Sequence, residues 1–293
     1  MSPDETKSGP VTVVKLGGSV LTSPGAYRRA ARFFRRRLDE EPQGRFVVVV
    51  SAEQGHTDAL LQAAQRIVQR PNPVMLDLLW STGELRSVAL LTLALHAAGV
   101  RATGLNVEQT GLLVRQKSGG ERSVTLEAGG LRRALERYRV AVAPGFLARR
   151  GSGAVVTLGR GGSDWTAVLL AAGLGADRCE LIKDVPGYFS DDPRTDPHAR
   201  HIPALTNDVA VAMARAGCDL VQQQALEEAA RRGVTLVIRS LDEPVLQTEV
   251  RHIQLDHADA ANHPDGLGAA EPMSTGFSAS HVPEDPLRGI PPT

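Results

Sequence analysis

The chain has 293 residues and balances 33 Lys and Arg against 33 Asp and Glu. This length suffices for one large domain or two lobes. A net charge of zero provides no global attraction to nucleic acid or to an anionic membrane, so we expect neither as a partner. The longest apolar stretch, 88–100, is too short to span a bilayer. The two cysteines, Cys179 and Cys218, make no disulfide framework, and residues 1–10 lack an apolar signal region. Both features predict a cytoplasmic protein.

Short β-branched runs alternate with longer helical patterns along the chain. The expected strands are 11–15, 46–50, 100–105, 140–143, 154–158, 180–183 and 234–238. The expected helices are 27–38, 56–69, 85–98, 131–138, 164–174, 207–216 and 223–232. Several strands are apolar at nearly every position, which is typical of parallel strands covered on both faces. The alternation predicts a layered α/β domain built from βαβ units. Residues 112–126, with Gly-Gly in their middle, predict a hairpin outside it.

The ends of the chain differ from this pattern. Residues 1–10 are expected to be a disordered N-terminus, and residues 11–245 form the predicted domain. From about residue 246 the periodicity stops, and from His257 onward the sequence is rich in Pro, Gly, Ser, Ala and Asp. We therefore predict a disordered tail over 246–293.

An arginine-rich helix, YRRAARFFRRRL (27–38), invites a nucleic-acid interpretation. Its apolar residues recur at helical spacing on one face, however, and most of its arginines fall on the opposite face, with Phe33 as the exception. This pattern favours a solvated outer helix of the fold.

The first strand ends in a glycine-rich turn, KLGGS (15–19). The carboxyl edge of an open α/β sheet is where such sheets bind ligands, and Lys15 projects there. Its ammonium group and the backbone N–H groups of the two glycines suit phosphate oxygens. The alternative is an ordinary tight turn, which this short pattern does not exclude.

A second glycine-rich turn, GRGGSD (159–164), joins an apolar strand to a helix. Its three glycines predict positive φ angles or a close backbone approach. Arg160 offers a planar fork for a carboxylate, while Ser163 and Asp164 suit the cap and first turn of the helix. The alternative makes Asp164 a helix cap and Arg160 a surface residue, and spacing alone does not decide.

A third element, KDVPGYFSDDPR (183–194), follows a strand with a Pro-Gly turn, two aromatic residues and a closing arginine. Tyr188 and Phe189 are candidates to face a purine, and Arg194 is a candidate to reach phosphates. The alternative is a loop with a hydrophobic plug.

Together these three elements, in this order, resemble the amino acid kinase superfamily, and within it the catalytic domain of aspartate kinases. The resemblance covers about residues 11–241. It also includes VVVVSAEQGHTDALL (47–61), STGELRSVALLTLALHAAGVRATGL (81–105) and AGCDLVQQQALEEAARRGVTLVIRS (216–240). The stretches TLGRGGSDWTAVLLAAGLGAD (157–177) and DVPGYFSDDPR (184–194) carry the most specific part of it.

The resemblance implies a three-layer α/β/α sandwich with a mainly parallel central sheet, in which MgATP phosphorylates a carboxylate. Lys15 would stabilise the transferring phosphoryl group and Asp164 would organise the catalytic centre, since phosphoryl transfer depends on positioning and charge neutralisation. The implied cofactors are ATP and Mg²⁺, without metal ligands assigned to the protein. A homodimer or larger assembly is also implied.

The resemblance implies two groups of binding residues. Arg160 and Glu84 would hold the α-carboxylate and α-amino groups of the amino acid. The residues implied around that substrate are Ser51, Glu84, Arg160, Gly161, Gly162 and Ser163. Those implied around the nucleotide are Gly17, Gly18, Ser19, Lys183, Asp184, Tyr188 and Arg194.

The sequence departs from the family pattern in four places. The family reads KFGGTS at the first turn, where this chain has Val20 in place of the last serine. The loop that commonly reads Gly-Lys-Thr is here 54–56, Gln-Gly-His. The late helix begins GAKVLHP in the family, and Asp219 replaces its phosphate-binding lysine. Only about fifty residues follow the resemblance, too few for the usual pair of regulatory ACT domains, so we expect no feedback inhibition through them.

One lysine suggests how the change at Asp219 is compensated. Only four lysines occur in the chain, and Lys183 replaces a threonine that is usual in aspartate kinases. We hypothesise that Lys183 supplies the lost positive charge, balanced by Asp219. The alternative is a surface lysine without measurable effect.

Three functions remain open from the sequence. The first is an aspartate-kinase-like enzyme that makes an acyl phosphate. The second keeps the fold but changes the acceptor to another carboxylate or to a phosphate monoester, since KLGGS also resembles the first turn of isopentenyl phosphate kinases. The third is a nucleotide- or amino-acid-binding subunit with little catalysis, which Asp219 motivates. Retention of Lys15, Glu84, Arg160 and Asp164 favours an enzyme.

Overall fold

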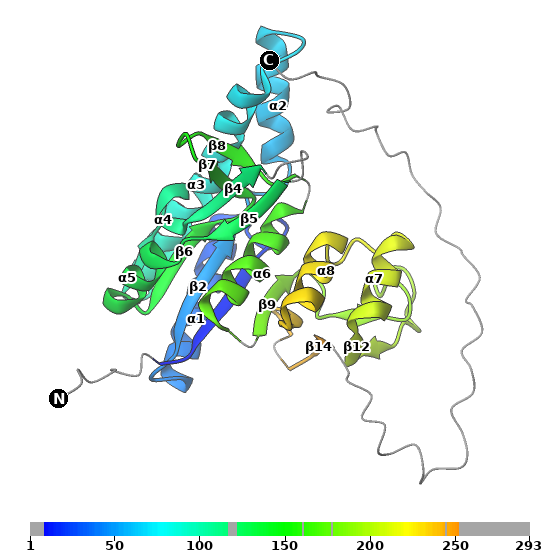
Figure 1. The fold of residues 1–293 in the computed structure, drawn as a ribbon. Helices are drawn as coiled ribbons and strands as arrows, with labels where there is room; N and C mark the ends of the chain where they lie inside the picture. Colours follow the sequence, from blue (N-terminus) through cyan, green and yellow to red (C-terminus); the bar gives the residue numbers. More distant parts are fainter. Residues whose placement is uncertain (1–8, 117–121, 160, 177, 244, 252–293) are drawn as a thin grey trace, which may run out of the picture.

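The computed structural model describes residues 9–116, 122–159, 161–176, 178–243 and 245–251. Within them an eight-stranded sheet has the order β12-β14-β13-β9-β1-β2-β6-β3 (Figure 1). The strands from β13 to β3 run parallel, while β14 pairs antiparallel with β13. Their bounds are β12 Ala204–Thr206, β14 Gln247–Arg251, β13 Thr235–Ser240, β9 Arg178–Lys183, β1 Val11–Leu16, β2 Arg45–Val50, β6 Val140–Pro144 and β3 Ala102–Gly104.

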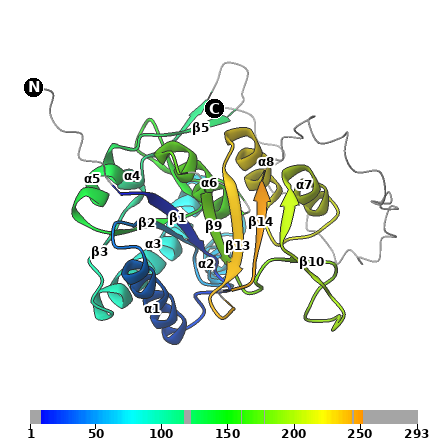
Figure 2. The same ribbon diagram turned by 90° about the horizontal axis from the view of Figure 1, so that it is seen from below.

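Helices cover both faces of this sheet, as Figure 2 shows. On one face lie α1 (Pro24–Glu40) and α3 (Pro73–Ala97), and on the other lie α6 (Gly162–Leu174) and α8 (Gln223–Arg232). Each face encloses its own core cluster of buried apolar side chains. The predicted three-layer α/β/α arrangement with a mainly parallel sheet is confirmed. The remaining helices are α2 His56–Ile67, α4 Val107–Thr110, α5 Gly129–Arg137 and α7 Asn207–Arg215.

The alternation of side chains along the strands decides which residues reach which layer. In β1, Val14 and Leu16 belong to the core beneath α1, whereas Val13 belongs to the core beneath α6. Because side chains alternate with a period of two, Lys15 shares the face of Val13. In β9 the same rule places Lys183 on the face of Leu181, toward α6.

A second, four-stranded sheet accounts for the predicted hairpin and corrects one strand. Its order is β5-β4-β7-β8, with β4 and β5 antiparallel as predicted. Residues 154–158 were expected in the parallel alternation, yet β8 pairs antiparallel with β7 in this smaller sheet. An apolar run shows that a strand is buried but does not specify its partner. The bounds are β4 Leu112–Gln116, β5 Arg122–Leu126, β7 Leu147–Arg150 and β8 Val155–Thr157, and a short pair is formed by β10 Tyr188–Phe189 and β11 His201–Ile202.

Two boundaries were placed wrongly from the sequence. Helix α3 begins at Pro73, twelve residues before the predicted start at 85. The Asn72 side chain accepts a hydrogen bond from the N–H of Val74, and proline suits the first helical position. Strand β14 extends the main sheet to Arg251, so the start of the predicted tail at 246 precedes the last strand. The rest of that tail and residues 1–8 lie outside the described residues.

Helix α1 is an outer helix, but its buried face is wider than predicted. Phe33 and Arg37 are both buried, in addition to the predicted apolar face. The guanidinium group of Arg37 donates two hydrogen bonds to Glu180 of β9, at 2.9 and 3.1 Å. Buried arginines need such a carboxylate partner. Helical periodicity could not identify this partner, which lies 143 positions away in the sequence.

Helix α3 is long and apolar enough to pass for a membrane-spanning segment by length and composition alone. A core helix passes the same test. Here Ser81, Glu84 and Ser87 are buried together with Val88 and Leu91 on its inner side. Those polar groups face the protein interior, which favours a core helix.

Candidate active site

Three charged side chains meet at the carboxyl edge of the main sheet. Lys15 is the penultimate residue of β1, Lys183 is the last residue of β9, and Asp164 lies in the first turn of α6. The Lys15 Nζ lies 2.8 Å from Asp164 Oδ1, and the Lys183 Nζ donates a 2.8 Å hydrogen bond to Oδ2. Strands β1 and β9 are parallel neighbours, so both lysines project toward the same helix. One carboxylate is thus held between two ammonium groups.

Burial strengthens the electrostatic attraction between Asp164 and the two lysines. The side chain of Asp164 is 3% exposed, and those of Lys15 and Lys183 are 8% and 12% exposed. Burial alone would raise the pKa of the Asp164 carboxyl, but the two ammonium groups outweigh it and hold that pKa well below its usual range. Burial lowers the pKa of Lys183, against the opposing attraction of Asp164. The cluster carries two formal positive charges and one negative charge, so its net formal charge is positive.

The predicted balance between Lys183 and Asp219 is not what the structure shows. Lys183 pairs with Asp164, while Asp219 is exposed in the turn before α8. The sequence showed that Lys183 adds a positive charge at this edge. It could not show that α6, rather than the segment before α8, supplies the partner.

The turn that precedes α6 explains its glycines. Gly159 and Gly161 have φ angles of 84° and 69°, which favour glycine. A Cβ atom at Gly161 would clash with the side chain of Gln222. Gly161 is the N-cap residue of α6, so the prediction of Ser163 as the cap is wrong. Arg160, predicted to bind the substrate carboxylate, lies outside the described residues.

The helix start after this turn is packed closely. Gly162 and Ser163 are buried in the first turn of α6, next to Asp164. A Cβ atom at Gly145 would lie 2.6 Å from the Cβ of Ser163. Gly145 and Gln222 therefore shape the site, and sequence reasoning missed both. A glycine and a glutamine give no signal of this kind without the contacts of the fold.

The KLGGS turn lies beside the lysine cluster. Gly17 is buried, and its N–H donates a 3.4 Å hydrogen bond to the carbonyl of Ile182 in the neighbouring strand. A Cβ atom at Gly18 would clash with the carbonyl oxygen of Ala52. Ser19 is exposed, and the N–H of Ser51 donates to the carbonyl of Leu16 at 3.3 Å. Gly17, Gly18 and Ser19 directly follow β1, and Ser51 directly follows the neighbouring strand β2. All four residues therefore lie at the same edge of the sheet as Lys15.

Glu84 is the buried carboxylate on the α3 side of the site. It is 4% exposed, and its Oε2 has no hydrogen-bond partner in the described part of the chain. Burial raises the pKa of Glu84 to about 8, although the backbone of Ala52 and the charge of Lys15 both counteract it. A buried carboxylate oxygen without a partner suits a cationic ligand group.

The pKa of Glu84 leads to a prediction about stability. Because the folded-state value of about 8 lies above the ordinary value of 4.5, the folded protein holds more protons than the unfolded chain between these two pH values. The free energy of unfolding should therefore fall as pH rises from 5 to 8, by at most about 1.4 kcal/mol per pH unit from this group. The variant Glu84→Gln should lose this component in urea unfolding measured across that range. If the free energy of unfolding of the variant fell with pH as steeply as that of the wild type, the raised pKa assigned to the buried Glu84 would be contradicted.

The third motif divides into an exposed part and a buried part. Arg194 lies 3.5 Å from Asp184 and 3.0 Å from Asp192, and its side chain is 68% exposed. Both predicted nucleotide residues, Asp184 and Arg194, are thus accessible to a ligand. Tyr188 is 1% exposed and belongs to the hydrophobic core, where its N–H donates to Thr248. Its ring offers no exposed face to a purine in this structure, which favours the hydrophobic plug for this residue.

Comparisons with known proteins agree with this architecture. The model of the Amino acid kinase family matches residues 10–240. The aspartokinase of Geobacillus stearothermophilus is 36% identical over 231 residues, which are 78% of this chain and 56% of that protein. The aspartate kinase structure from Synechocystis superposes with a TM-score of 0.74 at 33% identity, over 84% of this chain and 40% of that one.

A further solved structure, E. coli aspartokinase III in complex with aspartate and ADP, superposes with a TM-score of 0.70 at 24% identity. It covers 84% of this chain and 65% of that one, and at this identity it supports the fold alone. The chain spans about half the length of the curated relative it matches.

Proposed function

Because the chain belongs to the amino acid kinase family, we propose that it transfers the terminal phosphoryl group of MgATP to the side-chain carboxylate of a small amino acid. The observation that carries this proposal is the cluster of Lys15, Asp164 and Lys183 at the carboxyl edge of the sheet. Open α/β sheets bind their ligands at this edge. The substrate is proposed to be aspartate or a close analogue.

The cluster suits the charge that develops during phosphoryl transfer. Negative charge spreads over the three equatorial oxygens of the transferring group, and fixed cations stabilise it. Lys15 and Lys183 are held in place before the substrate arrives because Asp164 binds both. Such preorganisation avoids the cost of reorienting charges at the moment of reaction. Asp164 is therefore assigned to hold the two cations rather than to act as a base.

Glu84 supports an amino acid as the acceptor. Its unpartnered Oε2 suits an ammonium group, and Arg160 is proposed from the sequence to take the α-carboxylate. An ammonium group placed against Glu84 favours the ionised carboxylate. With the pKa of Glu84 near 8 in the free protein, we expect amino-acid binding at neutral pH to release a proton.

The nucleotide is proposed to bind near Asp184 and Arg194, with its terminal phosphates toward Lys183. Both carboxylate oxygens of Asp164 are engaged by lysines. The cluster therefore fits phosphate oxygens better than a metal ion, and we assign Mg²⁺ to the nucleotide phosphates. Mg²⁺ would supply further charge neutralisation there.

Lys183 is expected to contribute to phosphate binding, as the sequence hypothesis states. Lys183→Met should lower kcat/KM for MgATP by about tenfold to a hundredfold, since charge-assisted hydrogen bonds contribute roughly 1.5–3 kcal/mol. Lys183→Arg keeps the charge and should retain more activity than Lys183→Met. Steady-state kinetics with both variants test this, and unchanged constants in Lys183→Met would remove the residue from the site.

A homodimer is proposed from an apolar surface on the first half of α3. Val74, Met75 and Leu78 are 46%, 56% and 53% exposed. Adjacent exposed apolar side chains on one helix are typical of an interface. Light scattering after size exclusion should give twice the chain mass for the wild type and a smaller assembly for Met75→Glu/Leu78→Glu. The variant Leu93→Glu, 63% exposed on the other half of α3, is the control and should leave the mass unchanged.

A panel of acceptors separates this proposal from its alternatives. ADP formation from MgATP is measured with L-aspartate, with other carboxylates and with phosphate monoesters. Aspartate-dependent ADP supports the proposal, and turnover with another acceptor supports the same fold with a changed substrate. Nucleotide binding without turnover on any acceptor supports the binding subunit that Asp219 motivates. The proposed location is the cytoplasm, in keeping with the free thiols of Cys179 and Cys218.

A further inference from the structure

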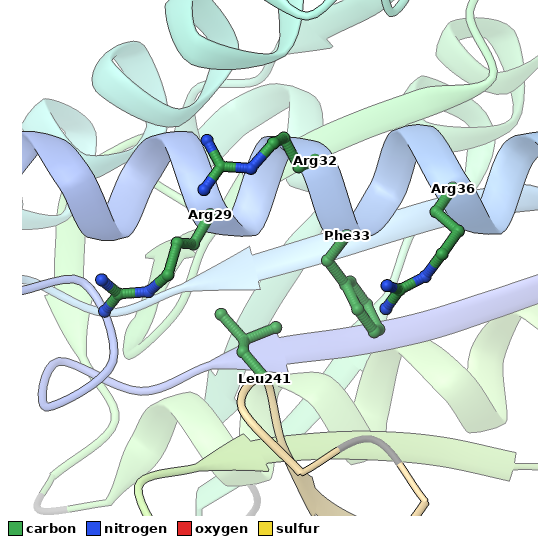
Figure 3. Close-up of a pocket in the computed structure, with 5 residues that line it drawn as sticks. All are labelled: Arg29, Arg32, Phe33, Arg36 and Leu241. Atoms are coloured by element: carbon green, nitrogen blue, oxygen red, sulfur yellow. The ribbon is translucent and has the colours of Figure 1, made fainter.

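A pocket between α1 and the segment that follows β13 lies apart from the lysine cluster, on the opposite face of the sheet. It encloses about 260 Å³ and is lined by Arg29, Arg32, Phe33, Arg36 and Leu241. Figure 3 shows Arg29 and Arg36 extending on either side of Leu241, with the Phe33 ring between Leu241 and Arg36. Two guanidinium groups thus flank a small apolar floor of Phe33 and Leu241, and Arg32 contributes to the lining from the same helix.

The spacing of these arginines follows from the helix. Residues 29, 32 and 36 recur at intervals of three and four, so they share one face of α1. The first and last are two turns apart, about 10 Å along the helix axis. Their positive charges therefore lie along the pocket rather than at one point.

The acidic neighbours of these arginines neutralise them only weakly. Arg29 lies 3.9 Å from Asp242, which is 80% exposed, and Arg36 lies 3.8 Å from Glu40, which is 58% exposed. Exposed ion pairs of this length contribute little free energy. An anionic ligand could replace them at small cost.

A second layer of arginines lies behind the floor. The guanidinium carbons of Arg37 and Arg239 are 5.7 and 5.4 Å from the centre of the Phe33 ring. Glu180 pairs with both and Glu41 pairs with Arg37 at 2.7 Å, but Arg239 Nε is buried without a partner in the described part of the chain. Burial lowers the pKa of Arg239, and the charges of neighbouring arginines lower it further against the attraction of Glu180. Positive charge is therefore concentrated here in a chain that is neutral overall.

We propose that this pocket binds a small molecule with two anionic groups, phosphate or carboxylate, near its ends. Each guanidinium group can donate two parallel hydrogen bonds to two oxygens of a carboxylate or of a phosphate. The apolar floor accommodates a short neutral middle, and the volume is below that of a typical drug-sized site. The pocket also adjoins the end of β13, because Leu241 follows Ser240, the register partner of Lys183.

The test measures binding of pyrophosphate and of glutarate to the full chain by calorimetry at low salt. The variant Arg29→Gln/Arg36→Gln removes two charges from the pocket. The control Arg28→Gln/Arg35→Gln removes the same charge from exposed positions of the same helix that do not line it. Since both double variants leave the lysine cluster intact, a difference between them belongs to this pocket and does not depend on the proposed kinase activity.

We expect at least one probe to bind saturably, with affinity at least about tenfold weaker in the pocket variant and within about twofold of wild type in the control. Equal weakening in both variants would show general surface charge and overturn the proposal. Absence of saturable binding by both probes below about 10 mM, a free energy of only about −2.7 kcal/mol, would overturn it as well.

Discussion

Asp164→Asn is expected to lower the free energy of unfolding by about 3–5 kcal/mol, because it leaves two buried lysines without their shared carboxylate. The loss should be largest near neutral pH. The pKa of Asp164 is held below its usual range, so its contribution is present above the unfolded-state value of about 4 and is lost as pH falls toward the folded-state value. Urea unfolding at pH 7 and at pH 3 measures both effects.

The matched control for this change is Asp208→Asn. Asp208 also lies in the first turn of a helix, α7, but is exposed. Loss of its interaction with the helix dipole should cost no more than about 1 kcal/mol. If both variants lose the same amount, the effect of Asp164 would be that of a helix terminus, and the account of a buried charge cluster would be wrong.

Lys15→Met is expected to lower kcat by about a hundredfold to a thousandfold, close to the effect of losing one group that stabilises transition-state charge. The residue is buried and Asp164 holds its ammonium group in place, so the substitution removes a preorganised cation from the site. Nucleotide affinity should change much less than turnover, because the interaction strengthens as charge develops. Single-turnover kinetics and nucleotide titration separate the two.

Urea unfolding of Lys15→Met must accompany these kinetic measurements, to show that the variant is folded. Lys15→Met leaves Asp164 paired with Lys183, so the fold should persist. A folded variant with wild-type kcat would exclude Lys15 from the transition state.

The layers of the fold could be predicted because their physical signals are local. The continuous apolar run at 46–50 indicates a strand buried on both faces, and the helical spacing of apolar residues at 27–38 indicates most of the buried face of α1. The partner of β8, the early start of α3 and the position of β14 depend on contacts between segments distant in sequence, which periodicity does not encode.

The candidate site could also be predicted only in part. Lys15, Asp164 and Lys183 were identified in three separate motifs, and the fold brings each lysine to 2.8 Å from Asp164. The pairing of Lys183 with Asp164 rather than Asp219 required the order of the strands. Tyr188 was predicted to line the nucleotide site from its motif, whereas its burial favours a place in the hydrophobic core. A motif specifies which residues are present, and packing decides which of them face a ligand.

The measurement that tests the central claim most directly is trapping of the product with hydroxylamine after incubation of the protein with MgATP and L-aspartate. The account predicts aspartyl hydroxamate in amounts matching ADP, and its loss in Lys15→Met. ADP without hydroxamate, or hydroxamate formed equally by Lys15→Met, would contradict transfer to a carboxylate at this site.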